Sequence, residues 1–183
     1  MPAPKGDVMT IGPRRATAPS PQGSGKPPSL REEEIRTAQD LLFFAYRDFT
    51  NAADVLLAEL GLGRAHHRAL HFIGRNPGIT VSGLLAILRI TKQSLARVLN
   101  ALIDQGYVGQ APGFEDRRLR LLTLTEAGQA LERRLFEGQR EKLAHAYRSA
   151  GPQAVSGFQT VMRAMMDKGA RDYIDGTGSP EDT

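Results

Sequence analysis

Apolar side chains recur at helical spacing across residues 30–61, and this pattern predicts one amphipathic helix of about 30 residues. The capping-box residues Ser29 and Glu32 mark its start, and Gly61 and Gly63 mark its end. Helices of globular proteins average about 11–12 residues, so this helix needs an apolar partner along most of its length. Its apolar positions are Ile35, Ala38, Leu41, Leu42, Ala45, Phe49, Ala52, Ala53, Leu56 and Leu60.

The middle of the chain predicts three shorter helices. The first covers about 63–75 and ends at an Asn-Pro-Gly turn. Thr80 is placed to cap a helix over 81–88 and Thr91 to cap a helix over 92–105, because threonine hydroxyls accept bonds from the free N–H groups of a helix start. The tight connection between the last two is typical of a helix-turn-helix unit. The residues expected to face inward from helix 92–105 are Leu95, Val98, Leu99, Leu102 and Ile103.

A β-hairpin is predicted directly after these helices. Gly106 suits the left-handed position at a helix end, and two strands over 107–110 and 119–124 flank a loop rich in turn residues. A hairpin that follows a helix-turn-helix makes a winged helix. The fold class is therefore mainly α with a small β-hairpin (α+β), a winged helix-turn-helix domain joined to a helical region.

Two more helices are predicted after the hairpin. Thr125 caps a long helix that lasts to about Arg148, and Gly151 with Pro152 separates it from a last helix over about 152–173. The apolar positions in phase on the long helix are Ala127, Leu131 and Leu135. Helical spacing of Met162, Met165 and Met166 favours an apolar dimer core over a cofactor box.

Composition excludes several classes of protein. The 183 residues contain no Cys, which excludes disulfides, thiolate zinc sites and thiol redox switches within this chain. No apolar run reaches the ~18–20 residues of a membrane helix, and no secretory signal pattern opens the chain. We therefore expect a cytoplasmic protein. Motifs of hydrolases, P-loop enzymes, dinucleotide binders and metalloproteases are missing from the sequence, so no enzyme and no cofactor are predicted.

Positive charge is concentrated in two segments. Residues 1–28 form a basic arm rich in Pro and Gly, which is predicted to be disordered. Residues 62–123 carry nine basic and three acidic side chains, whereas the whole chain has a net charge of +4. This clustering indicates a polyanionic partner, and an ordinary solvated surface is the alternative.

The start of helix 92–105 has the side chains that a DNA recognition helix needs. Arg97 is suited to a forked bond with guanine and Gln93 to a paired bond with adenine, while the hydroxyls of Thr91 and Ser94 are suited to phosphates. The alternative is an ordinary amphipathic helix with a polar outer face. The predicted DNA-binding residues of this helix and its cap are Thr91, Lys92, Gln93, Ser94 and Arg97.

The predicted hairpin tip is unusually basic. It contains Arg117, Arg118 and Arg120, and arginines on a protruding loop can enter a narrow minor groove, where the negative potential is enhanced. Asp116 is expected to orient the wing by holding the guanidinium group of Arg118. We predict that all three arginines bind DNA.

Three segments together resemble the MarR family of winged helix-turn-helix transcriptional regulators: Ile90–Asn100, Leu102–Val108 and Asp116–Gly128. The resemblance implies a homodimer that binds double-stranded DNA at a pseudo-palindromic operator, with a small molecule as a possible effector. It assigns the D-x-R wing role to Asp116 and Arg118. Gly83 departs from the family pattern, which often has Glu there, and so does the Pro-rich arm.

The resemblance and the periodicity together suggest how the chain is divided. Residues 29–61 and 125–174 are expected to form the helical dimerisation region, 62–124 the DNA-binding domain, and 175–183 a flexible tail. A winged-helix module that binds another protein and not DNA is the alternative function. The arginine-rich tip argues against this alternative, because a protein-binding wing has no need of three exposed arginines.

Three histidines cluster on the predicted helix 63–75. His67 and His71 are one turn apart, a spacing at which two imidazoles can bind one metal ion, with His145 or a carboxylate as the third ligand. Other interpretations are a ligand pocket that includes His67 and His71, or plain packing and hydrogen bonding, which also suits His66. Packing is favoured and no metal site is predicted.

Overall fold

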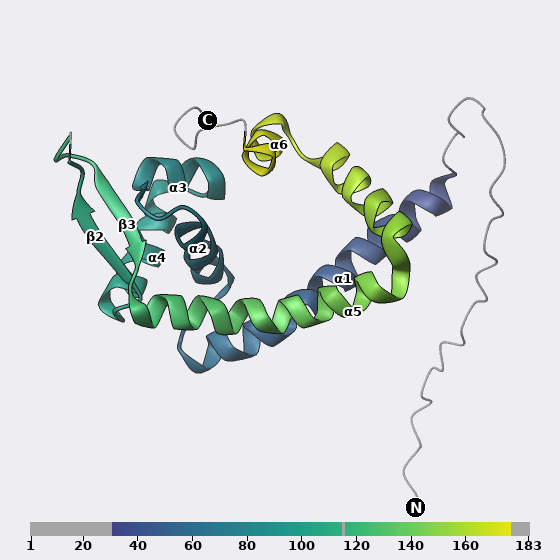
Figure 1. Cartoon of the computed structure of the whole chain (residues 1–183), viewed down its shortest axis with the longest axis horizontal. Helices are drawn as coiled ribbons and strands as arrows, with labels where there is room; N and C mark the ends of the chain where they lie inside the picture. Colours follow the sequence, from purple (N-terminus) through teal and green to yellow (C-terminus); the bar gives the residue numbers. More distant parts are fainter. Residues whose placement is uncertain (1–30, 115, 177–183) are drawn as a thin grey trace, which may run out of the picture. The chain divides into compact units, whose positions relative to one another are not determined.

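The computed structural model describes residues 31–114 and 116–176 of the chain (Figure 1). The contacts divide the chain after Ala38 into two units. In the first unit, residues 32–38 form the start of helix α1 (Glu32–Glu59). There the Arg31 backbone N–H donates to the Glu34 carboxylate at 2.9 Å. The predicted cap Ser29, the arm over 1–28 and residues 177–183 lie outside the described residues.

The second unit contains the three short helices that were predicted, each within one residue of its expected bounds. They are α2 (Arg64–Arg75), α3 (Val81–Leu88) and α4 (Lys92–Asp104). The backbone N–H of Gly83 donates to the Thr80 hydroxyl at 2.9 Å, and that of Ser94 donates to the Thr91 hydroxyl at 3.1 Å. Both predicted threonine caps are therefore confirmed.

The sheet has three antiparallel strands in the order β1-β3-β2: β1 (Ile79–Thr80), β2 (Val108–Pro112) and β3 (Arg120–Leu124). The sequence did not predict β1, since two residues are too few to show a period. Strand β2 extends beyond the predicted end at residue 110, because Ala111 and Pro112 still pair with Leu121 and Arg120. Pro112 is compatible with this position because β2 is an edge strand.

One apolar core joins α2, α3, α4 and the sheet to parts of α1 and α5. Its fully buried large side chains are Leu57, Leu70, Ile73, Leu84, Leu95, Leu102, Leu122 and Leu135. The predicted inward face of α4 is confirmed, with Ile103 only partly buried. In contrast, most of the predicted apolar face of α1 is exposed in the single chain, and Ala53 and Leu57 are its buried apolar residues.

Helix α5 (Glu126–Met165) is kinked at Gly151, whose φ of 80° and ψ of 165° are not helical. The predicted break is therefore confirmed. The predicted last helix over 152–173 is wrong, because α5 ends at Met165 and a separate helix α6 (Lys168–Asp175) begins after Asp167. The Asp167 carboxylate accepts the Ala170 backbone N–H at 2.9 Å and so caps α6. Residue 175, predicted to belong to a tail, is the last residue of α6.

The first turn of α5 shows a further difference from the predicted packing. Gly128 is buried there, whereas Ala127 is exposed. A Cβ atom on Gly128 would lie 2.0 Å from the Tyr107 carbonyl oxygen, so only glycine allows this approach. Within the described ranges, no helix has both the length and the apolar character needed to span a bilayer.

We predict that Gly128→Ala lowers the free energy of unfolding by about 2–4 kcal/mol, because α5 must move away from the backbone of Tyr107. Gly138→Ala on the same helix is the control, since its added Cβ meets Ala52 at an ordinary 3.7 Å. Alanine is the better helix former, so the control should be neutral or stabilising by up to about 1 kcal/mol. Urea unfolding at one protein concentration measures both, and equal stabilities would contradict the predicted clash.

Candidate nucleic-acid interface

The start of α4 presents a polar, exposed surface. Leu95 is 1% exposed and anchors the helix in the core. Lys92, Gln93, Ser94 and Arg97 are all exposed on the other side. The structure therefore brings together the residues of α4 that the sequence analysis selected, on a helix whose opposite face is buried.

The hydroxyl groups at this helix start differ in what they can still bind. The Thr91 hydroxyl accepts the Ser94 backbone N–H and donates its own proton to the Ser94 side-chain oxygen at 2.8 Å. The Ser94 hydroxyl keeps its proton free to donate to a phosphate. Thr91 thus holds the helix end in place, and Ser94 is the better phosphate ligand of the two.

The turn before α4 contains a feature that sequence reasoning missed. Arg89 has φ 50° and ψ 45°, and among the described residues it is the one non-glycine with positive φ. Its guanidinium group binds the Asp167 carboxylate at 2.6 Å. Helix α6 makes a second long-range contact through Tyr173, whose hydroxyl accepts a bond at 3.0 Å from the amide of Asn76, at the end of α2. No local sequence signal marks these contacts, because their partners are about 80 to 100 residues apart.

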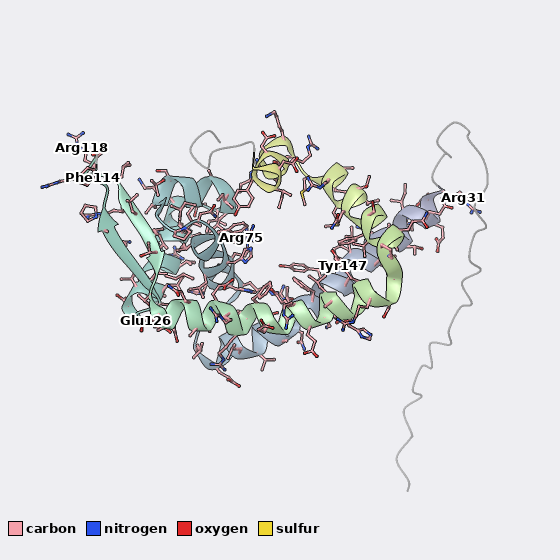
Figure 2. The ribbon with its side chains drawn as sticks, viewed as in Figure 1. Arg31, Arg75, Phe114, Arg118, Glu126 and Tyr147 are labelled. Carbon is pink, nitrogen blue, oxygen red and sulfur yellow. The ribbon has the colours of Figure 1, made fainter. Side chains whose placement is uncertain are left out.

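The hairpin of β2 and β3 forms a wing. Arg117, Arg118 and Arg120 are exposed on it. Asp116 does not hold the guanidinium group of Arg118 as predicted, because its carboxylate accepts the Arg118 backbone N–H at 2.8 Å. The acid therefore shapes the loop and leaves the guanidinium group available. Figure 2 shows Phe114 and Arg118 together at the tip.

The histidines of α2 lie on its half-buried side. The backbone N–H of Gly63 donates to the ring of His66 at 3.0 Å, which places this histidine in the helix cap. The ring of His71 lies 3.7 Å from the Glu132 carboxylate. Across the described ranges, no group of three His, Cys, Asp or Glu side chains is arranged to hold a metal ion.

Burial lowers the pKa of both His67 and His71. For His67, desolvation is the largest cause of the lowered pKa and repulsion from His71 is the second, while the charge of Asp54 raises the pKa and opposes both. For His71, desolvation is the largest cause, Glu132 opposes it, and the charge of Arg75 adds to it. Both rings are therefore biased toward the neutral form.

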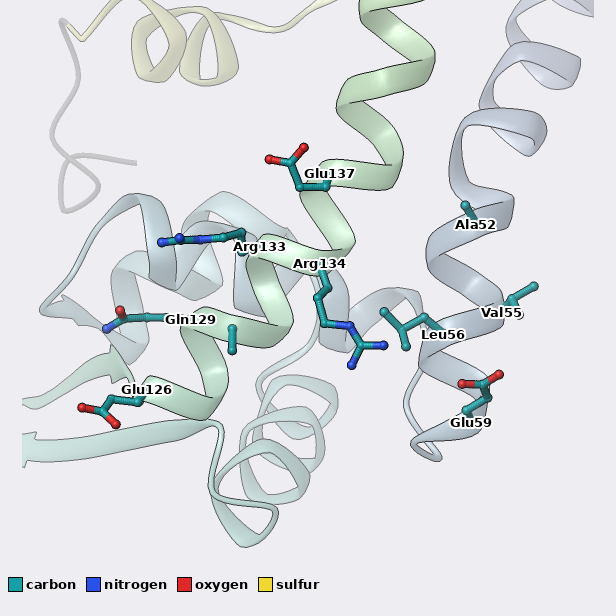
Figure 3. Close-up of a pocket in the computed structure, with 10 residues that line it drawn as sticks. Ala52, Val55, Leu56, Glu59, Glu126, Gln129, Arg133, Arg134 and Glu137 are labelled. Carbon is teal, nitrogen blue, oxygen red and sulfur yellow. The ribbon is translucent and has the colours of Figure 1, made fainter.

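A groove of about 860 Å³ lies between α1 and the start of α5 (Figure 3). Its α1 wall is mostly apolar, with Ala52, Val55 and Leu56, whereas its α5 wall is charged. Arg134 extends from α5 toward Leu56 in this view. The groove does not contain His67 or His71, so the structure separates it from the predicted histidine pocket.

These elements define the class of protein. A helix-turn-helix, a three-stranded sheet and a basic two-stranded wing make a winged helix-turn-helix protein. The model of the MarR family matches residues 60–119. The HTH-type transcriptional regulator PetP of Rhodobacter capsulatus is 53% identical over 142 residues, which cover 78% of this chain and 86% of that relative. The chain therefore belongs to the MarR family of transcriptional regulators.

Solved structures share the fold. FabT of Streptococcus pneumoniae, in complex with DNA, matches with a TM-score of 0.60 and 19% identity, over 72% of this chain and 94% of that one. A mutant of MarR from E. coli, complexed with operator DNA, matches with a TM-score of 0.58 and 20% identity, over 74% and 97% of the two chains. These similarities confirm the predicted winged-helix fold.

We predict that the free energy of unfolding falls as the pH falls from about 7.5 to 5.5. The pKa values of His67 and His71 are lowered in the folded state, whereas histidines of the unfolded chain keep their ordinary pKa of about 6.5. As the pH falls below this value, the unfolded chain therefore binds more protons than the folded protein, which favours unfolding. His71→Gln should make this pH dependence shallower. Urea unfolding across the pH range measures the slopes, and equal slopes for wild type and His71→Gln would refute the assignment.

Proposed function

We propose that this MarR-family regulator binds double-stranded DNA as a homodimer, at a pseudo-palindromic operator, through the start of α4 and the wing. One observation carries the proposal: the exposed polar start of α4 and the arginine-bearing wing are built on the same apolar core, within a segment, 62–123, that carries nine basic and three acidic side chains. The two DNA complexes among the similar structures support it.

The two parts of this surface have different roles in the proposal. Arg97 and Gln93 of α4 read base edges in the major groove, where each base pair has its own pattern of donors and acceptors. Lys92 and Ser94 bind phosphates beside them. The wing arginines enter the neighbouring minor groove and position the protein on the duplex. Asp116 and Thr91 act indirectly, through the loop and the helix cap.

Exposed apolar side chains support the homodimer. A monomer seldom exposes large contiguous apolar surface, yet α1, α5 and α6 do so repeatedly. The exposed large apolar residues of these helices beyond Ala38 are Leu41, Leu42, Phe43, Phe44, Tyr46, Val55, Phe136, Leu143, Phe158, Val161, Met165 and Ile174. We propose that 29–61 and 125–174 form the dimerisation region and that 62–124 form the DNA-binding domain.

We further propose that a small effector modulates DNA binding. The half-buried side of α2 with His67 and His71 is the candidate contact, because imidazoles biased toward the neutral form offer both a donor and an acceptor. The Glu132 carboxylate of α5 lies 3.7 Å from the ring of His71 and adds a further acceptor.

The dimer is tested by sedimentation. We expect the wild-type protein to be a dimer at micromolar concentration. Leu41→Asp on α1, where the side chain is 65% exposed, should shift it toward monomer, because it places a charge in the apolar interface. Leu119→Asp on the wing is the matched control and should remain dimeric. A wild-type monomer would exclude the proposed dimer.

DNA binding is tested with two arginine variants. Arg97→Ala should cost about 1–3 kcal/mol on a preferred duplex and much less on a scrambled one. Arg118→Ala should weaken binding to both duplexes and lower the salt dependence by roughly one contact per subunit. Arg140→Ala removes an equal charge from exposed α5 and should change neither. Wild-type protein that shows no salt-dependent duplex binding would favour the protein-interaction module instead.

A further inference from the structure

The wing contains a fully exposed aromatic side chain. Phe114 is 100% exposed at the tip of the hairpin. Burying a Phe side chain contributes about 1.5–3 kcal/mol, and Phe114 contributes none of this to the fold. Single exposed apolar residues are common on protein surfaces, so the surroundings of Phe114 decide what its exposure means.

The loop that holds Phe114 is fixed by short-range contacts. The Gly113 backbone N–H donates to the Leu119 carbonyl at 3.0 Å, and the Leu119 N–H donates to the Asp116 carbonyl at 3.1 Å. A Cβ on Gly113 would lie 2.6 Å from that same Asp116 carbonyl oxygen, so the loop is closed tightly at its base. Together with the bond from the Arg118 N–H to the Asp116 carboxylate, these contacts fix the backbone on both sides of Phe114, whose ring is fully exposed.

Charged residues of both signs follow this ring in the sequence of the wing. Glu115 and Asp116 come first, and the Asp116 carboxylate is bound to the Arg118 backbone. The exposed Arg117 and Arg118 come next, and Arg120 starts the returning strand. An exposed apolar group on a loop with three arginines matches a surface where anions border a stacked, apolar interior. The minor groove of duplex DNA has this arrangement, with phosphates along both edges and base steps between them.

We propose that Phe114 is a DNA-contacting wedge, which inserts against a base step of the same minor groove that the wing arginines enter. The proposal rests on the DNA-binding function proposed above. Proteins that insert Phe or Leu in this way partly unstack the step, and pyrimidine–purine steps such as TA resist this least. Phe114 therefore favours sequences whose base steps unstack easily. The wing arginines, in contrast, respond only to the electrostatic potential of the groove.

The test uses the full-length protein and a duplex that it selects from a random-sequence pool. Hydroxyl-radical footprinting locates the minor-groove step at the wing, and 2-aminopurine is placed in that step. With wild-type protein we expect the fluorescence to rise as the base unstacks. We also expect tighter binding when the step is TA than when it is AA.

Phe114→Ala should abolish the fluorescence rise and the TA preference and lower affinity about tenfold, a loss comparable to that of one base–aromatic stack. Because no charge is removed, its salt dependence should stay at the wild-type value, which separates it from Arg118→Ala. Phe114→Trp should restore the fluorescence rise. Leu119→Ala, in the same loop, is the control and should behave as wild type.

The possible failures are distinguishable. If the wild type selects no duplex, the proposed function fails and the wedge fails with it. If the wild type binds duplex with a steep salt dependence but Phe114→Ala keeps its affinity, fluorescence and step preference, only the wedge is overturned. If Phe114→Ala keeps all DNA properties but loses binding to an acidic protein partner, the ring is a protein contact and the proposal is wrong. Unfolding curves of Phe114→Ala and Phe114→Trp should match that of the wild type, since the fully exposed Phe114 makes no contribution to the core.

Discussion

The contact of Gly128 with the backbone of Tyr107 determines how the parts of this protein meet. Tyr107 lies between the end of α4 and the start of β2, and Gly128 lies in the first turn of α5. Two further bonds close the same junction: the Thr125 hydroxyl donates to the Gly106 carbonyl at 2.6 Å, and the Thr125 N–H donates to the Tyr107 carbonyl at 3.1 Å. Helix α4, the wing and α5 therefore extend in fixed directions from this one junction.

Local signals in the sequence predicted the elements that surround this point. Thr80, Thr91 and Thr125 each cap the helix that follows, and Gly106 has the positive φ expected of it. Such signals act over three or four residues, so they can be read without knowing the tertiary structure. The apolar face of α4 was predictable for the same reason, since one helical period fixes which side is buried.

The features that the sequence did not reveal depend on distant partners. Strand β1 exists because Ile79 and Thr80 pair with β3, more than 40 residues later. The left-handed backbone of Arg89 has no propensity signal, since arginine has no special tolerance for positive φ. For Asp116, the predicted guanidinium partner lost to the nearer backbone N–H of Arg118, a common outcome for Asp in turns. The residue types of the candidate site were thus predictable, whereas their bonding depended on the fold.

The kink at Gly151 has a geometric consequence for the whole C-terminal part. A straight helix of 40 residues would carry the chain about 60 Å away from the Gly128 junction. With Gly151 out of the helical region, the chain returns, and Asp167 and Tyr173 reach Arg89 in the turn before α4 and Asn76 at the end of α2. The segment from α5 to α6 is therefore attached to the winged helix-turn-helix at both of its ends. Such a closed segment has fewer ways to move than a free arm, so the position of α4 is tied to the geometry of the helices that follow it.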